Sequence, residues 1–276
     1  MRSARASALL LAALVASCDR TPPPPAAQTS ANSLRIVAND YSYVSPDTVA
    51  AGLTNIVMVN HGKEPHQASI FRLDSGKTMN DVQAVMKTMT TIPAWMTFTG
   101  SPNGADPGDS SNTTATLAAG NYLIVCFYSS PDGKAHLDKG MAKPFVVKGA
   151  GAAMAMPTGD ITVTTKDYAF EVSAAITAGT HTIRMANAGP QLHEITVVKM
   201  APGKTMKDAQ TWMAAGMKGM PPFSSFGGIA GLTVGQSANF TATFTPGEYA
   251  FLCFVPDSKD GKPHLAHGMV MPFKVS

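Results

Sequence analysis

The sequence predicts an all-β protein with two tandem sandwich or barrel domains, each interrupted by one short helix. First, one motif occurs twice: a run from Gly120 to Cys126 and a second run from Gly247 to Cys253 both read Gly-x-Tyr-x-x-x-Cys. Second, short apolar and β-branched runs alternate with Gly, Pro and Asn, as in antiparallel sandwiches. Third, the matching positions keep one constant offset from Asp40 to Cys126, so this part of the repeat needs no gap.

Residues 1–17 are predicted to be a lipoprotein signal peptide. Arg2 and Arg5 precede an apolar stretch, and the segment Val-Ala-Ser-Cys ending at Cys18 resembles a bacterial lipobox. We therefore expect cleavage before Cys18 and lipidation of its thiol, because the segment is too short to span a bilayer. An ordinary signal peptide is the alternative. The expected location is extracytoplasmic, with the chain anchored by lipid to a bacterial membrane on its periplasmic side.

Residues 18–33 are predicted to form a Pro-rich tether, since four consecutive prolines favour a semi-rigid extended spacer. The formal net charge of +3 falls to +1 without Arg2 and Arg5, because residues 1–17 contain no acid. Without basic runs, this balance gives no reason to expect a nucleic acid partner. The oligomeric state is left open.

The first domain is predicted to span residues 34–148. Its expected strands are Leu34–Ala38, Asn55–Val59, His66–Phe71, Thr113–Leu117, Tyr122–Phe127 and Phe145–Val147. Both faces of the run Tyr122–Phe127 are apolar, so this strand is expected to be central and buried. It would hold Cys126 on a rigid element, out of water.

Residues 149–159 are rich in Gly, Ala and Met and are predicted to be the linker between the domains. The second domain is predicted to span residues 160–276. Its expected strands are Ile161–Thr165, Thr182–Ala186, His193–Lys199, Ser237–Thr243, Tyr249–Phe254 and Pro272–Val275.

One helix is predicted in each domain. Thr78 with Asp81, and Thr205 with Asp208, have the spacing of a capping box. Apolar residues then recur at helical spacing. They are Met79, Val82, Met86 and Met89 in the first domain and Met206, Ala209, Met213 and Met217 in the second. We expect these stripes to serve as core or as docking surface, because methionine fills irregular gaps.

A candidate metal-binding pattern repeats in both halves. Each copy places a Cys, a His and a Met in that order, with His and Met joined by His-Leu-x-x-Gly-Met. A second imidazole follows an Asn-x-Gly turn, and it precedes the Cys by the same number of residues in both halves. The candidate ligands are His66, Cys126, His136 and Met141 in the first half and His193, Cys253, His264 and Met269 in the second. Thiolate, imidazole and thioether together select copper over hard cations.

This pattern resembles the cupredoxin, or type 1 blue-copper, family. The resemblance covers both halves and implies Greek-key β-sandwich or barrel domains with up to two coppers per chain. The long loop from Cys to His resembles that of copper nitrite reductases. The family implies that two His and one Cys hold copper, that Met is a weak axial ligand, and that the loop His lies nearest solvent. Its neighbours Leu137, Ala142, Leu265 and Val270 would then offer a docking patch to transient redox protein partners.

Several functions are compatible with the pattern. It favours an electron carrier, and a protein that stores or delivers copper outside the cytoplasm is an alternative. In multicopper oxidases and nitrite reductases a His flanks the copper Cys, whereas Val125 and Phe127 flank Cys126 here. Those activities are therefore disfavoured. An enzyme with copper at a domain or subunit interface would need the remaining histidines to converge, namely His61, His181 and His267.

Two readings without copper are further alternatives. A disulfide between Cys126 and Cys253 is disfavoured, because equivalent positions of two separate sandwiches seldom approach closely enough for a bridge. A degenerate sandwich that has kept the motif but binds a partner without metal is the other.

Overall fold

The computed structural model describes residues 31–88, 92–151, 154–215 and 219–276. We call residues up to 148 the N-terminal half and residues from 160 the C-terminal half. The N-terminal half contains β1 (Asn32–Asn39), β2 (Ser42–Val44), β3 (Thr48–Ala50), β4 (Gly52–Asn60), β5 (Ser69–Leu73), α1 (Met79–Thr88), β6 (Met96–Pro102), β7 (Ser110–Leu117), β8 (Gly120–Val125) and β9 (Ala142–Lys148). The C-terminal half contains β10 (Ile161–Lys166), β11 (Ala169–Val172), β12 (Gly179–Asn187), β13 (His193–Met200), α2 (Met206–Ala214), β14 (Phe223–Leu232), β15 (Ser237–Phe244), β16 (Gly247–Leu252), a short 3₁₀ helix (His264–His267) and β17 (Val270–Val275).

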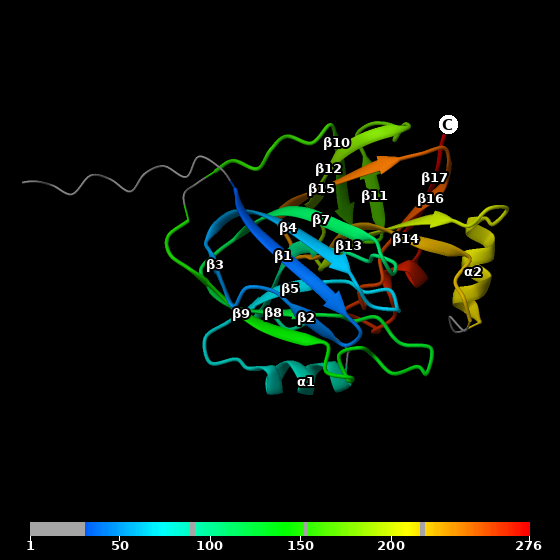
Figure 1. Ribbon diagram of the computed structural model, residues 1–276. Helices are drawn as coiled ribbons and strands as arrows, with labels where there is room; N and C mark the ends of the chain where they lie inside the picture. Colours follow the sequence, from blue (N-terminus) through cyan, green and yellow to red (C-terminus); the bar gives the residue numbers. More distant parts are fainter. Residues whose placement is uncertain (1–30, 89–91, 152–153, 216–218) are drawn as a thin grey trace, which may run out of the picture.

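The strands form two large sheets, and both halves contribute to each sheet (Figure 1). One sheet has eight strands in the order β11-β10-β12-β15-β7-β4-β1-β2, and the other has nine in the order β17-β16-β13-β14-β6-β5-β8-β9-β3. Equivalent strands occupy mirrored places, so each half has one layer in each sheet. This confirms the predicted all-β class with one short α-helix in each half.

The halves meet edge to edge. β7 pairs with its counterpart β15, and β6 pairs with its counterpart β14, where Thr99 lies opposite Leu232 and Pro102 opposite Ile229. Side chains reinforce the junction: the Asn103 amide donates to Thr196 Oγ1 at 2.8 Å. A single buried cluster runs from Leu34 to Val275. The halves therefore form tandem sandwiches, as predicted, and they are joined through two continuous sheets and one large apolar cluster.

Each helix packs its apolar stripe against a sheet. Met79 and Met86 contact a cluster that contains Phe71 and Val82, while Met206 and Met213 contact one that contains Val198 and Ala209. The described methionines of both stripes thus pack against the core, which agrees with the expectation of a core role and not with that of a docking surface. Met89 and Met217 lie outside the described residues. In the described part of the chain, no helix is long and apolar enough to cross a membrane.

The predicted helix caps are present. The Thr78 N–H donates to Asp81 Oδ2 at 2.9 Å, and the Thr205 N–H donates to Asp208 Oδ2 at 2.8 Å. In both cases the threonine hydroxyl donates to the same oxygen at 2.8 Å. In each helix the aspartate carboxylate thus satisfies the N–H of the capping threonine, as in a capping box.

Three strand boundaries beside candidate ligands differ from prediction. β8 is central and buried as predicted, but it ends at Val125, so Cys126 follows the strand. Its N–H leaves the ladder and donates to the Met141 carbonyl at 3.2 Å, which ties the strand end to the returning loop. β5 begins only at Ser69, and His66 forms an isolated bridge with Ala105. β16 likewise ends at Leu252, one residue before Cys253.

Candidate metal centres

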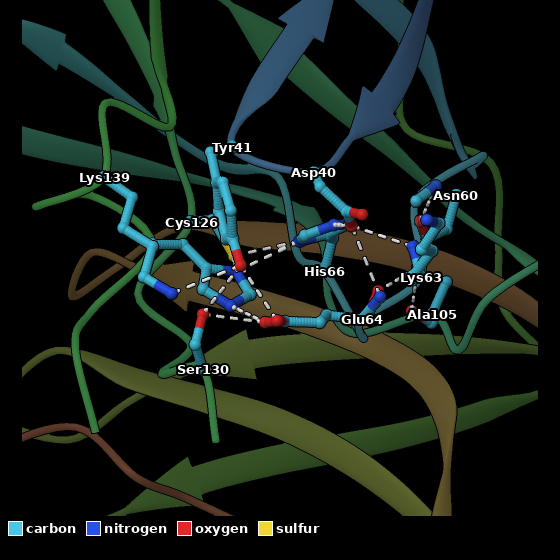
Figure 2. A network of polar contacts seen from close by, with 12 residues as sticks. Asp40, Tyr41, Asn60, Lys63, Glu64, His66, Ala105, Cys126, Ser130 and Lys139 are labelled. Atoms are coloured by element: carbon cyan, nitrogen blue, oxygen red, sulfur yellow. Dashed lines mark hydrogen bonds and ion pairs between the residues drawn. The ribbon is translucent and has the colours of Figure 1, made fainter. Parts of the chain in front are cut away.

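The first cluster unites three predicted ligands of the N-terminal half. His66 Nδ1 lies 3.1 Å from His136 Nδ1, and Cys126 Sγ lies 3.3 Å from His136 Nδ1 and 4.0 Å from His66 Nδ1. All three residues are at most 1% exposed. Three donor atoms therefore face a single buried point, and their arrangement with neighbouring polar groups is shown in Figure 2.

The second cluster repeats this geometry in the C-terminal half. His193 Nδ1 lies 3.1 Å from His264 Nδ1, and Cys253 Sγ lies 3.5 Å from His264 Nδ1 and 4.0 Å from His193 Nδ1. These residues are 0% exposed. The matching distances show that the sequence repeat corresponds to a repeated three-dimensional arrangement of donor atoms.

A buried asparagine shapes the loop before each strand-side histidine. Asn60 Nδ2 donates to the carbonyls of Glu64 and Ala105, and Asn60 Oδ1 accepts from the Gly62 N–H at 2.8 Å. A Cβ at Gly62 would lie 2.6 Å from His66 Nε2, so a side chain does not fit there. Asn187 makes the equivalent contacts in the C-terminal half. The Asn-x-Gly turn thus lets the backbone pass directly over the ligand histidine.

The returning loop fixes the other histidine and the methionine. The His136 N–H donates to the Tyr128 carbonyl, and the Met141 N–H donates to the His136 carbonyl at 2.9 Å. Met141 is 0% exposed and lies in the same apolar cluster as Cys126. Met269 is 0% exposed and lies in a cluster with Cys253. Both methionines are thus buried, and their axial role stays a prediction.

Carboxylates hold the strand-side imidazoles in one tautomer. His66 Nε2 lies 3.2 Å from Asp40 Oδ1, and His193 Nε2 lies 3.0 Å from Asp167 Oδ1. When Nε2–H donates to the carboxylate, Nδ1 keeps its lone pair and points it into the cluster. This is the contact by which proteins orient metal-binding histidines. The repeated pairs Asp40-Tyr41 and Asp167-Tyr168 were visible in the sequence only as repeat markers.

The protonation of each cluster fits a metal site. Burial lowers the pKa of His66 and of His136, and it lowers the pKa of His193 to about 4. Burial also raises the pKa of the Cys126 thiol to about 11 and raises that of Cys253. Neutral imidazoles can bind a metal directly. Each thiol must release its proton when the metal binds, because the thiolate is the ligand. Two imidazoles and one thiolate around one point suit copper.

A polar cover lies over the loop histidine of the N-terminal half. His136 Nε2 contacts Glu64 Oε2 at 2.8 Å, and Glu64 also accepts from the hydroxyls of Tyr41 and Ser130. The Tyr41 ring meets the His136 ring edge to face at 5.4 Å, and Lys139 Nζ lies 4.5 Å above the Tyr41 ring. Burial would raise the pKa of Glu64, but the bonds from Ser130, Tyr41 and His136 outweigh it and lower the pKa.

The C-terminal half builds its cover from different residues. Asp257 accepts from the Tyr168 hydroxyl at 2.5 Å and from Gln191 Nε2 at 2.9 Å. Those bonds, first the one from Tyr168, hold the pKa of Asp257 well below its usual range. His264 Nε2 lies 3.8 Å from Asp257 Oδ2 and has no hydrogen-bond partner among the residues that the structure describes. His267 stacks on the Tyr168 ring at 4.9 Å, where Lys139 stands in the other half.

The expected exposure of the loop histidines is wrong. His136 is 1% exposed and His264 is 0% exposed. Leu137, expected in an apolar docking patch, is itself buried, and the other three members are only partly exposed: Ala142, Leu265 and Val270. The physical reason is the polar cover, which fills the space above each imidazole. Tyr41 and Tyr168 are partly exposed and so are the aromatic groups between the loop histidines and water.

The remaining predicted residues are placed as follows. Cys18 and its lipidation lie outside the described residues. Cys126 and Cys253 are free and buried, so the disulfide alternative is not formed. His181 contacts Asp160 at 2.5 Å, and His267 contacts Asp260 at 3.1 Å.

Within the described ranges, the three remaining histidines form no group of potential ligands with one another. His61 and His181 belong to no group of three potential ligands there, and His267 groups only with Asp257 and Asp260. The oxygens of Asp257 already accept hydrogen bonds from Tyr168, Gln191 and the Lys259 N–H.

Comparisons with known proteins give partial likenesses. No protein family description matches the chain, and no curated protein matches it. Among solved structures, the chain is similar to a dithionite-reduced auracyanin from the photosynthetic bacterium Roseiflexus castenholzii, with 24% identity, 42% of this chain and 94% of that chain covered, and a TM-score of 0.30. It is also similar to auracyanin A, a "blue" copper protein from Chloroflexus aurantiacus, with 18% identity, coverages of 42% and 98%, and a TM-score of 0.31.

A copper-containing nitrite reductase from Thermus scotoductus is similar along 90% of this chain and 61% of its own, with 11% identity and a TM-score of 0.24. Because all these TM-scores are low, the assignment of the clusters to copper rests on the chemistry of the donor atoms. With an all-β fold and two buried His-Cys-His clusters that suit copper, the chain matches the predicted resemblance to the cupredoxins, with room for up to two coppers.

Proposed function

We propose that the protein is an extracytoplasmic electron carrier, tethered by a lipid on Cys18, with one type 1 copper site in each half. The repeated cluster of two Nδ1 atoms and one sulfur, all buried, supports this proposal most directly. His66, Cys126 and His136 would hold one copper, with Met141 as the weak axial ligand. His193, Cys253, His264 and Met269 would hold the other.

The chain contributes a fixed and dry setting for electron transfer. Copper bound at each cluster supplies the one-electron couple between Cu(II) and Cu(I). The buried imidazoles and sulfur exclude water from the site. Asp40 and Asp167 hold the tautomers, and the Asn60 and Asn187 turns hold the backbone above the rings. A preorganised donor set limits the rearrangement that accompanies a change of oxidation state.

The electron would not leave through a solvent-exposed imidazole, because both loop histidines are buried. Tyr41 packs edge to face on His136, and Tyr168 packs the same way on His264, each with ring centroids 5.4 Å apart. Both tyrosines reach the surface, so we place the contact with transient redox protein partners there. Replacing Tyr41 with Leu should slow electron exchange with a partner protein at the N-terminal site, while the visible spectrum of that site stays intact.

The direct test is a visible spectrum and a copper count on the chain without residues 1–30, after addition of Cu(II). We expect an intense thiolate-to-copper band near ~600 nm and about two coppers per chain. Cys126→Ser and Cys253→Ser should each remove one copper and part of the band, and the double variant should remove both. A chain that binds copper without this band would overturn the type 1 assignment.

A chelator challenge distinguishes the carrier from a copper donor. A carrier with enclosed sites should retain its copper against a Cu(I) chelator over many redox cycles, whereas a storage or delivery protein should release it.

For the location, fractionation of cells that make the full chain should find it with membranes. Cys18→Ala should release it or block its maturation, and recovery of the unaltered chain in the soluble cytoplasmic fraction would contradict the lipid anchor.

A further inference from the structure

The two sulfurs have different neighbours although their ligand sets match. Cys126 Sγ accepts hydrogen bonds from the N–H groups of Gln67 and Tyr128 and also contacts the Tyr43 hydroxyl. Cys253 Sγ accepts from the N–H groups of Glu194 and Val255, which are the repeat equivalents of Gln67 and Tyr128. The hydroxyl contact is the one that has no counterpart.

Phenylalanine stands where that hydroxyl would be. Tyr43 lies opposite Ala38 in the β1–β2 pair, and Phe170 lies opposite Thr165 in the equivalent β10–β11 pair. Phe170 packs against the cluster that contains Cys253 and Met269. The backbone therefore brings an aromatic ring to both sulfurs, but a hydroxyl to Cys126 alone.

The Tyr43 hydroxyl has one proton and two acceptors. It is buried, and in the structure it donates to the Gln67 carbonyl while also contacting Cys126 Sγ. A hydrogen bond to an ion is roughly twice as strong as one between neutral groups. Once Cys126 is a thiolate, its sulfur therefore attracts the phenolic proton more strongly than the neutral carbonyl does.

A donor at the sulfur favours the reduced form of a copper site. In Cu(II) the sulfur shares much of its negative charge with the metal, whereas in Cu(I) it retains more of that charge. The hydrogen bond is then stronger in the reduced state, and hydrogen bonding around the cysteine sulfur is one of the properties that tune the potential of such sites.

We propose that Tyr43 gives the N-terminal copper the higher reduction potential, so that in a singly reduced chain the electron resides in the N-terminal half. This inference rests on the proposed function, with one type 1 copper in each half. In the internal step, Cu(I) at the C-terminal site loses one electron and Cu(II) at the N-terminal site gains it. No bond breaks, and the phenolic proton stays on Tyr43.

The test is a reciprocal exchange, Tyr43→Phe and Phe170→Tyr, in the copper-loaded chain. Both are made in a Glu194→Gln background, because Gln67 is the equivalent residue and the two halves then match there. Spectroelectrochemical titration gives the potentials, and Cys126→Ser and Cys253→Ser assign them to halves. Tyr43→Phe should lower the N-terminal potential by at least a tenfold change in the reduction equilibrium, or about 59 mV for one electron. Phe170→Tyr should raise the C-terminal potential.

Tyr122→Phe and Tyr249→Phe are matched controls, because these buried hydroxyls donate to backbone carbonyls of Ala118 and Thr245. They should leave both potentials unchanged. An unchanged N-terminal potential in Tyr43→Phe would overturn the inference, since the Tyr43 hydroxyl would then donate to the Gln67 carbonyl in both oxidation states. If Phe170→Tyr does not load copper, Tyr43→Phe alone decides. Absence of the thiolate-to-copper band in the unaltered chain would instead refute the proposed function.

Discussion

The two halves hold the same donor atoms in different surroundings. Near His136 the carboxylate is Glu64, and its partner across the cover is Ser130. Near His264 the equivalent positions are Gln191 and Asp257, so the carboxylate has moved to the opposite side of the cover. Each half keeps one carboxylate above its loop histidine. The comparison shows that the donor atoms and the backbone around them are the same in both halves. The residues above the loop histidine differ, and the loss of a carboxylate at one position is matched by a gain at its partner position.

The largest expected effect is on copper uptake as the pH changes. The thiol pKa of Cys126 is raised to about 11 and that of Cys253 is also raised, while the histidine pKa values are lowered. Binding therefore releases one thiol proton per site between pH 6 and 9, and affinity should rise about tenfold per pH unit, or about 4 kcal/mol over that range. Competition titrations on Cys126→Ser and Cys253→Ser measure each site separately.

The same titrations compare the halves. The Tyr43 contact favours the Cys126 thiolate and outweighs the repulsion from Glu64, whereas repulsion from Glu194 is the main effect after burial that disfavours the Cys253 thiolate. The N-terminal site should therefore fill first with limiting copper. Filling of the C-terminal site first would contradict this order.

The next effect concerns folding of the copper-free chain. Burial raises the pKa of Glu194 from 4.5 to about 7, whereas Gln67 cannot ionise. Between these pH values the folded state keeps a proton that the unfolded state has lost, so stability falls as pH rises. The loss should reach about 3 kcal/mol above pH 7. Denaturant unfolding at pH 4.5 and pH 8 should show this loss in the unaltered chain and not in Glu194→Gln.

A third prediction breaks and restores the cover. Glu64→Gln removes the carboxylate that His136 Nε2 contacts, and copper affinity of the N-terminal site should fall about 10- to 100-fold. Adding Ser130→Asp recreates the arrangement of Gln191 and Asp257 and should recover most of the loss. Chelator competition on the Cys253→Ser background measures this. If the double variant binds no better than the single one, the exchange is not compensated.

The smallest expected effect comes from the helix caps, which are alike in the two halves. Thr78→Ala and Thr205→Ala should each cost about 1 kcal/mol of stability, because each removes the hydroxyl that contacts the capping aspartate. Thermal unfolding should show similar shifts for both, with copper content unchanged. A much larger effect of one variant would mean that its helix also supports the nearby metal centre.

The repeat made the fold class and the candidate ligands predictable. Two histidines and a cysteine at matched positions in both halves are predictable as a ligand set, because thiolate and imidazole donors together suit copper. The carboxylates of the cover were harder to find: Glu64 and Asp257 occupy positions that are not equivalent, so a search for repeated residues passes over them.

Other features depend on packing that a linear pattern does not encode. β6 contains Gly, Pro, Ser and Thr, and β14 has Gly and Ser among its apolar residues, so neither follows a simple strand pattern. Their pairing across the halves is a long-range contact. The burial of His136 and His264 depends on side chains from three separate segments of the chain. The end of β8 before Cys126 depends on the hydrogen bond from its N–H to the Met141 carbonyl.

The edge pairing of β6 with β14 and of β7 with β15 has a consequence for how such a chain arises. An isolated half would present two open strand edges to water, which proteins normally keep covered. Because the paired edges are equivalent in the two copies, a solitary half would cover them with a second molecule of itself. Tandem duplication thereby joins a twofold assembly of separate chains into a single polypeptide. In such a polypeptide the residues around Cys126 and those around Cys253 can change independently.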